Sequence, residues 1–333
     1  MSKISTKATS KLVVKTTQTE LPPHRQKLVD MVIANLQKGQ IPWHRGWSAD
    51  DFPKNAITNK EYRGVNYLLL SMMPYSDNRW CTFLQAKEKG WKIKKGAKGT
   101  PVELYKHLDV RTGKEVDWDK IKAETAKMSV DEKREFFKKN IRTLLRTYIV
   151  FNGEQVDGIP ERVINPMTEK QLATQSAKAE NIIANSESKI YYNGMGKNYY
   201  RPSTDTIHLC NINTFETMQD YYATAFHEMA HSTGHESRLN RDMIAFFGTE
   251  SYAKEELCVE LASMFMQQDI GLTLSDEHIK NHSAYIQSWI KLFKDDPKEL
   301  FNAVSQANKI SKYVLGYETK TATCEIMLDE TYE

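Results

Sequence analysis

The chain has 333 residues, of which 40% are hydrophobic and 27% are charged, and its formal net charge is +3. This length predicts two domains, and the composition is that of a globular protein with enough apolar side chains for buried cores. No signal peptide is evident, and no apolar run reaches the roughly 20 residues that span a bilayer. Because the four cysteines also include no C-x-x-C pair, we expect no disulfide framework, no cysteine zinc site and no membrane partner, and a cytoplasmic location.

The N-terminal part of the chain is basic. Residues 1–100 carry 18 Lys and Arg against 7 Asp and Glu, whereas the remaining residues carry 28 against 36. A basic part joined to an acidic part is typical of a polyanion-binding module attached to another domain. Residues 1–20 are rich in Ser, Thr and Lys, and we expect them to form a flexible basic tail.

The first folded domain is expected over residues 21–160. Apolar residues at helical spacing predict an amphipathic helix over 24–39. Turn residues between short apolar runs predict a mixed α/β module over 53–100. Residues 107–142 form a charged insertion that we expect to be helical and solvated, and a strand is expected next, at 147–152.

Lysines and aromatic residues alternate in this domain. Proteins that bind single strands combine cations that contact phosphates with aromatic rings on which bases stack. Packing in the hydrophobic core is the alternative for each tryptophan, and a solvated face is the alternative for the lysines. The candidate DNA contacts are Trp43, Trp47, Tyr62, Arg63, Trp80, Trp91, Lys92, Lys94, Lys95 and Lys98.

The second domain is expected over residues 161–318 and is rich in helices. A short β region is expected at 189–209. Helical periodicity predicts helices at 169–184, about 214–235, 250–268 and 283–295. Residues 319–333 are expected to form a C-terminal tail. The whole chain is therefore predicted to be of the α+β class, with a mixed α/β domain followed by an α-rich domain.

The helix expected at 214–235 contains the sequence HEMAH. In H-E-x-x-H on a helix, two histidines one turn apart present nitrogens to one metal ion, and the glutamate reaches the water on that ion. These residues are His227, Glu228 and His231. We predict that the two histidines bind zinc, with another divalent ion such as Mn²⁺ as the alternative, and that Glu228 is the general base.

A third ligand is needed, because catalytic zinc generally takes three protein ligands. The metzincin pattern requires a histidine where this chain has Ser237, so that pattern is excluded. His235 is a less favoured alternative ligand, because the helix is expected to end before it. In "EELCVELASMF", Glu256 and Glu260 lie one turn apart. This arrangement resembles that of gluzincins, which implies that Glu256 binds the metal and Glu260 orients a ligand histidine. The reverse assignment remains open, as does a solvated pair formed by Glu255 and Glu256.

Such a site would hydrolyse peptide or amide bonds. Zinc lowers the pKa of its bound water to about 7, Glu228 would take the proton and return it to the leaving amine, and a nearby donor would stabilise the oxyanion. The candidate donors are Tyr221, Tyr222, Tyr252 and His282. Packing elsewhere is the alternative for each of them.

Several separate motifs occur in the order found in a known family. They are "IPWHRGW", "NAITNKEYRGVN", "RWCTFLQAKEKGWKIKKGAKGTPV", "VFNGEQVDGIP", "FHEMAHSTGHESRLNR" and "EELCVELAS". From about residue 22 to 315 the chain resembles ArdC-type antirestriction proteins, which are themselves similar to the N-terminal part of TraC-type plasmid primases. The insertion at 107–142 looks longer than the usual connection of the family, and the tail "TKTATCEIMLDETYE" matches none of its motifs.

The resemblance implies an N-terminal single-stranded DNA-binding domain and a C-terminal zincin-like metallopeptidase domain. It further implies a protein of mobile elements that protects incoming DNA from host restriction during conjugation. The expected partners are single-stranded DNA and a host DNA-bound protein such as a restriction enzyme. Two alternatives remain: a DNA-protective binding protein whose metal site is not proteolytically active, and a soluble metallopeptidase recruited to an acidic protein partner.

Overall fold

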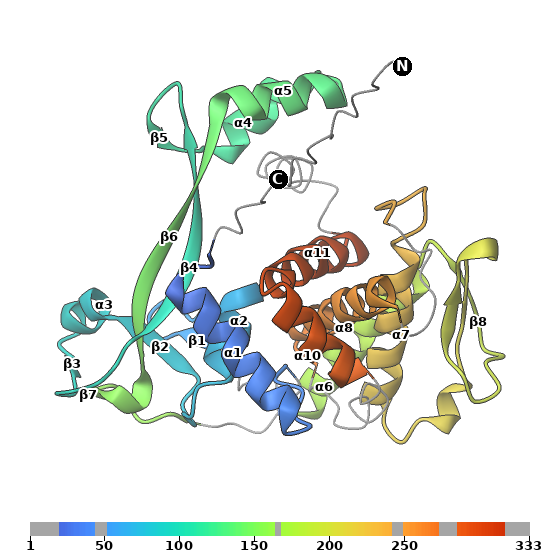
Figure 1. Cartoon of the computed structure of the whole chain (residues 1–333), viewed down its shortest axis with the longest axis horizontal. Helices are drawn as coiled ribbons and strands as arrows, with labels where there is room; N and C mark the ends of the chain where they lie inside the picture. The colour runs from blue at the N-terminus through green and yellow to red at the C-terminus, as the bar shows by residue number, and fades with distance from the viewer. Residues whose placement is uncertain (1–19, 44–51, 164–167, 242–248, 273–284, 317–333) are drawn as a thin grey trace, which may run out of the picture.

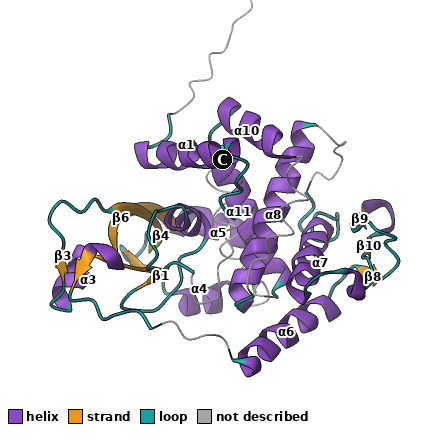
Figure 2. Cartoon of the chain, turned by 90° about the horizontal axis from the view of Figure 1, so that it is seen from below, coloured by secondary structure: helices purple, strands orange, loops and turns teal. Residues whose placement is uncertain are grey.

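The structure is a computed structural model that describes residues 20–43, 52–163, 168–241, 249–272 and 285–316. Strands gather at two opposite sides of the molecule, with most of the helices between them (Figures 1 and 2). Residues 1–19 of the predicted N-terminal tail, the predicted C-terminal tail, Trp47 and His282 lie outside the described residues. None of the described helices is long and apolar enough to cross a membrane.

A five-stranded sheet of order β1-β2-β6-β4-β5 forms the basis of the N-terminal half. Its strands are β1 (Lys54–Asn55), β2 (Arg79–Thr82), β4 (Thr100–Asp109), β5 (Lys114–Glu115) and β6 (Ile141–Asn152). β4 and β6 pair in antiparallel fashion from Thr100 opposite Val150 to Asp109 opposite Ile141. They form a twisted ribbon that extends away from the body of the molecule (Figure 1). The predicted strand at 147–152 is therefore the second half of β6, in which Val150 is buried whereas Tyr148 and Ile149 are exposed.

The charged insertion lies at the far end of this ribbon. Its middle part folds into helices α4 (Trp118–Thr125) and α5 (Val130–Asn140), as predicted, and each helix begins at a residue whose side chain caps the first turn, Asp117 and Ser129. The prediction of a wholly helical, solvated segment over 107–142 was wrong at both ends, because these residues continue β4 and β6. The helices also bury a small core of their own, formed by Val116, Ile121, Phe137 and Ile141.

Three more helices and a small two-stranded sheet complete the N-terminal half. They are α1 (Pro23–Gln37), α2 (Gly64–Ser71), α3 (Phe83–Glu88), β3 (Lys92–Ile93) and β7 (Val156–Asp157). α1 confirms the predicted amphipathic helix: it begins at a proline and ends before Gly39, whose positive φ of 72° suits glycine.

The C-terminal half consists of helices and a three-stranded sheet of order β8-β10-β9. Its elements are α6 (Glu169–Ala184), β8 (Lys189–Tyr191), β9 (Tyr199–Arg201), β10 (Thr206–His208), α7 (Met218–Ser232), α8 (Glu250–Ile270), α10 (Ile286–Asp295) and α11 (Glu299–Val314). α6, α7, α8 and α10 correspond to the predicted helices, and the β region was also predicted. α11 was missed, although its apolar residues Leu300, Val304 and Ala307 recur at helical spacing and are buried.

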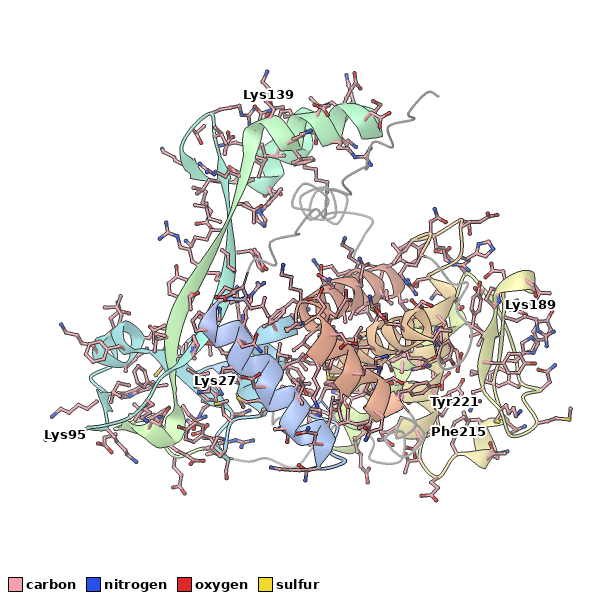
Figure 3. The ribbon with its side chains drawn as sticks, in the orientation of Figure 1. Lys27, Lys95, Lys139, Lys189, Phe215 and Tyr221 are labelled. Atoms are coloured by element: carbon pink, nitrogen blue, oxygen red, sulfur yellow. The ribbon has the colours of Figure 1, made fainter. Side chains whose placement is uncertain are left out.

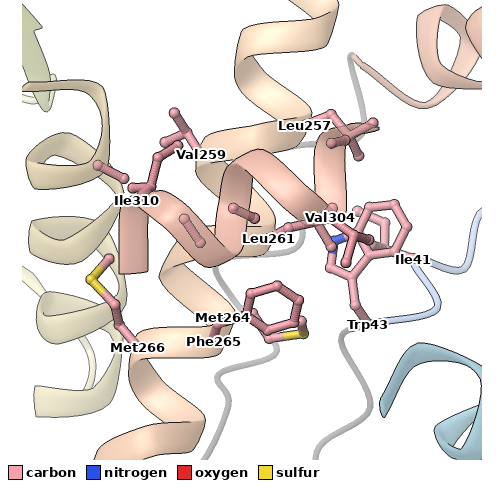
Figure 4. Packing of buried hydrophobic residues seen from close by; sticks show 14 of the residues in the cluster. Ile41, Trp43, Leu257, Val259, Leu261, Met264, Phe265, Met266, Val304 and Ile310 are labelled. Carbon is pink, nitrogen blue, oxygen red and sulfur yellow. The ribbon is translucent and has the colours of Figure 1, made fainter. Parts of the chain in front are cut away.

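One hydrophobic cluster connects the two halves. Residues of α1 and α2 belong to the same cluster as residues of α7, α8, α10 and α11. The indole of Trp43 packs against that of Trp289, with 5.6 Å between ring centroids, and it lies beside Ile41, Leu261 and Val304 (Figure 4). A domain boundary near residue 160 stays a prediction. A fragment cut there would lose the helices that cover α1, so we expect that residues 21–160 alone do not fold as an independent module.

Replacing Trp43 with alanine is expected to destabilise the whole chain by about 3–5 kcal/mol, because the side chain is 0% exposed and its removal leaves a cavity. Urea unfolding followed by circular dichroism measures this loss. Lys95→Ala, at an exposed position, is the control and should change stability by less than about 0.5 kcal/mol. Unchanged stability of the Trp43 variant together with weaker DNA binding would restore the stacking role for this ring.

Candidate metal centre

The helix that carries HEMAH is α7. Thr217 caps its first turn by accepting a hydrogen bond from the backbone N–H of Asp220, and the Asp220 carboxylate accepts one from the N–H of Thr217. Alanine, methionine and phenylalanine surround the motif, so the helix lies in the core. His227 and Glu228 are each 7% exposed. The two histidines project from the same side of this buried helix, one turn apart.

Three side chains from α7 and α8 meet at one point. Nitrogen atoms of His227 and His231 and a carboxylate oxygen of Glu256 all lie within 4.8 Å of one another, which makes this trio a possible metal-binding group among the described residues. The Glu256 oxygens lie 3.5 Å from Nε2 of His227 and 3.4 Å from Nε2 of His231. A tetrahedral ion with bonds of about 2.0–2.2 Å holds its ligand atoms about 3.3–3.6 Å apart. The donor set therefore fits a divalent metal ion.

Glu260 lies on the far side of the first histidine. Its carboxylate is 3.3 Å from Nδ1 of His227, whereas Glu256 faces the Nε2 atoms. This geometry favours Glu256 as the metal ligand and Glu260 as the residue that orients His227, and it does not favour the reverse assignment. A hydrogen bond to Nδ1 also keeps the Nε2 lone pair directed at the metal position.

Glu255 is not part of a solvated pair, so that interpretation was wrong. Its carboxylate lies 3.3 Å from Nδ1 of His231 and also receives a hydrogen bond from Arg241. Glu256 is only 4% exposed. Each histidine of the motif therefore has its own acidic partner on α8, and only Glu260 was expected from the sequence.

The ionisation of this cluster follows from its packing. Burial alone would raise the pKa of Glu256, but hydrogen bonds to His227 and His231 bring it well below its usual range. Burial would lower the pKa of His231, yet Glu255 and Glu256 raise it to about 9. Glu255, despite burial, has its pKa lowered to about 2 by His231 and Arg241. A divalent ion entering the cluster would therefore displace protons from the imidazoles.

His235 does not join the cluster. α7 ends at Ser232, and Nδ1 of His235 lies 2.8 Å from the hydroxyl of Ser237 instead. The less favoured prediction that this histidine supplies a ligand is thus not supported by the geometry.

Two tyrosines lie beside the metal-binding group. Tyr252 precedes Glu256 by one turn of α8, and its hydroxyl is 3.3 Å from that of Tyr285. Burial is the largest cause that raises the pKa of both phenols, and the charge of Glu256 raises them further. The charge of Glu228 also raises the pKa of Tyr285. Tyr252 was a predicted donor. Tyr285 was missed, because its position depends on the packing of α10 against α8.

The other two predicted donors, Tyr221 and Tyr222, are buried on α7 and have partners elsewhere. The Tyr221 hydroxyl lies 2.8 Å from that of Tyr192, and Tyr222 donates a hydrogen bond of 3.1 Å to Glu180. Figure 3 shows Tyr221 on the side of α7 that faces the small sheet, next to Phe215. Their hydroxyls are bonded away from the histidines and Glu256.

The predicted DNA contacts divide into buried and exposed residues. Trp43 and Trp80 are 0% and 1% exposed, so the prediction that bases stack on these two rings is corrected: they are core residues. Trp91 is half-buried and packs against the hydrophobic cluster around Cys81. Arg63 pairs with Asp269 of α8, and the neighbouring carbonyl of Tyr62 accepts a hydrogen bond from α8.

The lysines are exposed. Lys94 donates a hydrogen bond of 2.8 Å to the carbonyl of Glu154, whereas Lys92, Lys95 and Lys98 present their side chains to solvent. Lys95 projects from the outer end of the N-terminal half (Figure 3). An exposed aromatic ring that the sequence did not single out, Phe83, is 62% exposed at the start of α3.

Comparisons with known proteins match both halves separately. Residues 22–151 match the N-terminal domain of anti-restriction factor ArdC, and residues 177–306 match a zincin-like metallopeptidase domain. The chain is 36% identical to DNA primase TraC of Escherichia coli over 312 residues, which cover 90% of this chain and 27% of the primase. It thus spans about a quarter of that relative. It is 30% identical to the uncharacterized protein y4eC of Sinorhizobium fredii, over 90% of this chain and 94% of that protein.

Solved structures agree with these matches. The metal-free crystal structure of the antirestriction ArdC protein from the R388 plasmid superposes with a TM-score of 0.61 at 29% identity, over 91% of this chain and 98% of that chain. The Mn(II)-bound structure of that protein gives the same TM-score and identity over 88% and 97%. The HEMAH helix, the glutamate on the next helix and the small sheet beside them therefore define a zincin-like domain, preceded by an ArdC N-terminal domain. The chain belongs to the family of ArdC-type antirestriction proteins, which confirms the resemblance and the α+β class.

Proposed function

We propose that this protein binds single-stranded DNA through its N-terminal half and hydrolyses peptide bonds at a divalent metal site in its C-terminal half. By doing so it protects DNA that enters with a mobile element from host restriction. The observation that carries the proposal is the meeting of His227, His231 and Glu256 at one buried point, with Glu228 beside them on α7. The related ArdC protein is an antirestriction protein from the R388 plasmid, which supports this biological role.

The metal is proposed to be zinc, with Mn²⁺ as the alternative because the related ArdC protein has been solved with Mn(II). Nitrogen and carboxylate donors in a three-ligand set suit zinc and leave one position open. When bound, the ion would polarise a water molecule and the scissile carbonyl. Glu228 would take the proton from the water and return it to the leaving amine. The hydroxyls of Tyr252 and Tyr285, which lie 3.3 Å apart, would donate hydrogen bonds to the oxyanion.

The DNA part of the proposal rests on exposed charge. Lys92 lies in β3, and Lys95 and Lys98 lie in the segment that connects β3 to β4; none of the three has a described acidic partner within ion-pair distance. Lysines of this kind attract phosphates without reading sequence. Phe83, on the neighbouring helix α3, offers a ring face for a base.

Replacing Lys92 and Lys95 with alanine is expected to weaken single-strand binding for all sequences alike. It should also make the log-log salt slope shallower by about 1–1.5 units, since each phosphate neutralised on a single strand contributes about 0.7. Fluorescence anisotropy with a labelled oligonucleotide at several salt concentrations measures both the affinity and the salt slope. The matched control is the double variant Lys291→Ala and Lys294→Ala on α10, two exposed lysines in the other half. An unchanged slope in the first variant would place the DNA elsewhere.

A second candidate function is protection by occupancy, in which the protein covers incoming DNA without cutting any protein. Glu228 favours hydrolysis, since a structural metal site needs no general base. Conjugation of a plasmid into a restricting host separates the two functions. Hydrolysis predicts that Glu228→Gln abolishes protection, whereas occupancy predicts full protection by this variant and its loss in the lysine variant.

A further inference from the structure

The segment that follows α7 returns to the end of that helix. Residues 233–241, which we call the return segment, contain two arginines, Arg238 and Arg241, that have no part in the function proposed so far. The last carbonyls of a helix lack partners within the helix and carry partial negative charge, so cations are favourable there. Both guanidinium groups donate hydrogen bonds to carbonyls of the last turns of α7.

Arg238 connects the end of α7 to the small sheet. It donates a hydrogen bond of 2.7 Å to the carbonyl of Ser232 and forms an ion pair with Asp205. Asp205 also accepts hydrogen bonds of 2.8 Å from Ser188 and from Tyr200. None of these groups contacts a histidine of the metal-binding group, so the role of Arg238 is to stabilise the fold.

Arg241 connects the end of α7 to α8. Its Nη2 donates a hydrogen bond of 2.9 Å to the carbonyl of Ala230, and Nη1 donates one to the hydroxyl of Thr233. The same guanidinium holds both carboxylate oxygens of Glu255, at 2.8 Å from Nη2 and 3.2 Å from Nε. Glu255 in turn lies 3.3 Å from Nδ1 of His231. A continuous chain of contacts thus runs from Arg241 through Glu255 to His231.

The two histidines differ in how firmly the surrounding helices hold them and their acidic partners in place. His227 lies inside α7, and its acidic partner Glu260 lies inside α8. His231 is in the last turn of α7, where helices fray, and its partner Glu255 lies nearer the start of α8. A guanidinium can hold one carboxylate with two donors and still reach a carbonyl, whereas a lysine ammonium has no such fork.

We propose that Arg241 is a positioning residue of the metal centre, which holds Glu255 against His231 Nδ1 so that Nε2 is directed at the metal. The inference rests on the proposed metal binding by His231. Arg241 is the last residue of the sequence "HSTGHESRLNR", which departs from the metzincin pattern at Ser237. The proposal thus gives this sequence a role in metal binding that does not require a third histidine ligand.

Zinc affinity of the purified full chain, measured by competition with a chromogenic chelator, tests the proposal. Arg241→Gln and Glu255→Gln are each expected to weaken zinc binding about 10–100-fold, the usual effect of losing a residue that orients a ligand. Arg241→Lys should fall between wild type and Arg241→Gln. Arg238→Gln is the matched control, because it removes an arginine of the same segment and the same helix end: it should lower the melting temperature but keep wild-type zinc affinity. The visible absorption of the Co²⁺-substituted protein should change in the first two variants and not in the control.

The outcomes distinguish a failure of the positioning role of Arg241 from a failure of the proposed metal binding. If wild type binds zinc and both Arg241→Gln and Glu255→Gln bind it equally well, the positioning role is overturned and the metal site stands. An equal loss of affinity in Arg238→Gln would also overturn it, because the segment would then act only through the stability of the fold. Should Arg241→Gln fail to fold by circular dichroism, Glu255→Gln, which preserves side-chain volume, decides. A wild-type chain that binds no zinc, Mn²⁺ or Co²⁺ overturns the proposed function itself.

Discussion

Replacing His227 and His231 together with alanine is expected to remove the bound metal completely. The purified wild-type chain should hold about one divalent ion, since its three donors surround a single point, and the double variant would retain only the Glu256 carboxylate. Elemental analysis after removal of free metal measures this content. A full metal content in the double variant would refute the assignment of the site.

Three further variants sharpen this experiment. His235→Ala is the matched control, because this histidine lies four residues after His231 yet contacts Ser237 and not the cluster; it should keep the ion. Glu256→Gln should lower affinity more than Glu260→Gln, because Glu256 faces both Nε2 atoms whereas Glu260 contacts only Nδ1 of His227. The opposite order would exchange their roles.

Replacing Glu228 with glutamine is expected to lower the rate of peptide hydrolysis by about 10²–10⁴-fold, the usual contribution of a general base. Glutamine has nearly the same shape but cannot accept the proton from water. The bound metal and single-strand affinity should remain at wild-type values, because Glu228 is outside the group of three ligands. Release of fluorescent peptides from a labelled, unfolded protein substrate measures the rate, with and without single-stranded DNA.

The control for this prediction is Glu236→Gln, an exposed glutamate of the return segment. It should hydrolyse the substrate at the wild-type rate. Equal rates in wild type and Glu228→Gln would show that Glu228 is not the base. Absence of hydrolysis in wild type on DNA-bound and free substrates alike would favour protection by occupancy.

The sequence by itself determined what depends on neighbouring residues along one helix. The spacing of His227 and His231, with Glu228 between them, is the period of an α-helix, so their common face followed from local geometry. The same period placed Glu256 and Glu260 on one side of the next helix. Both helices were confirmed, because buried apolar residues at regular spacing leave few other ways to fold such segments.

Only the tertiary structure decided which side chains from different elements meet. Whether Glu256 or Glu260 faces the Nε2 atoms depends on the rotation of α8 against α7, which no periodicity records. The contact of Arg241 with Glu255 requires the chain to turn back after α7. Exposure is decided in the same way. Trp43 is buried because α10 presents Trp289 to it, whereas Lys95 is exposed because no described element covers the segment between β3 and β4.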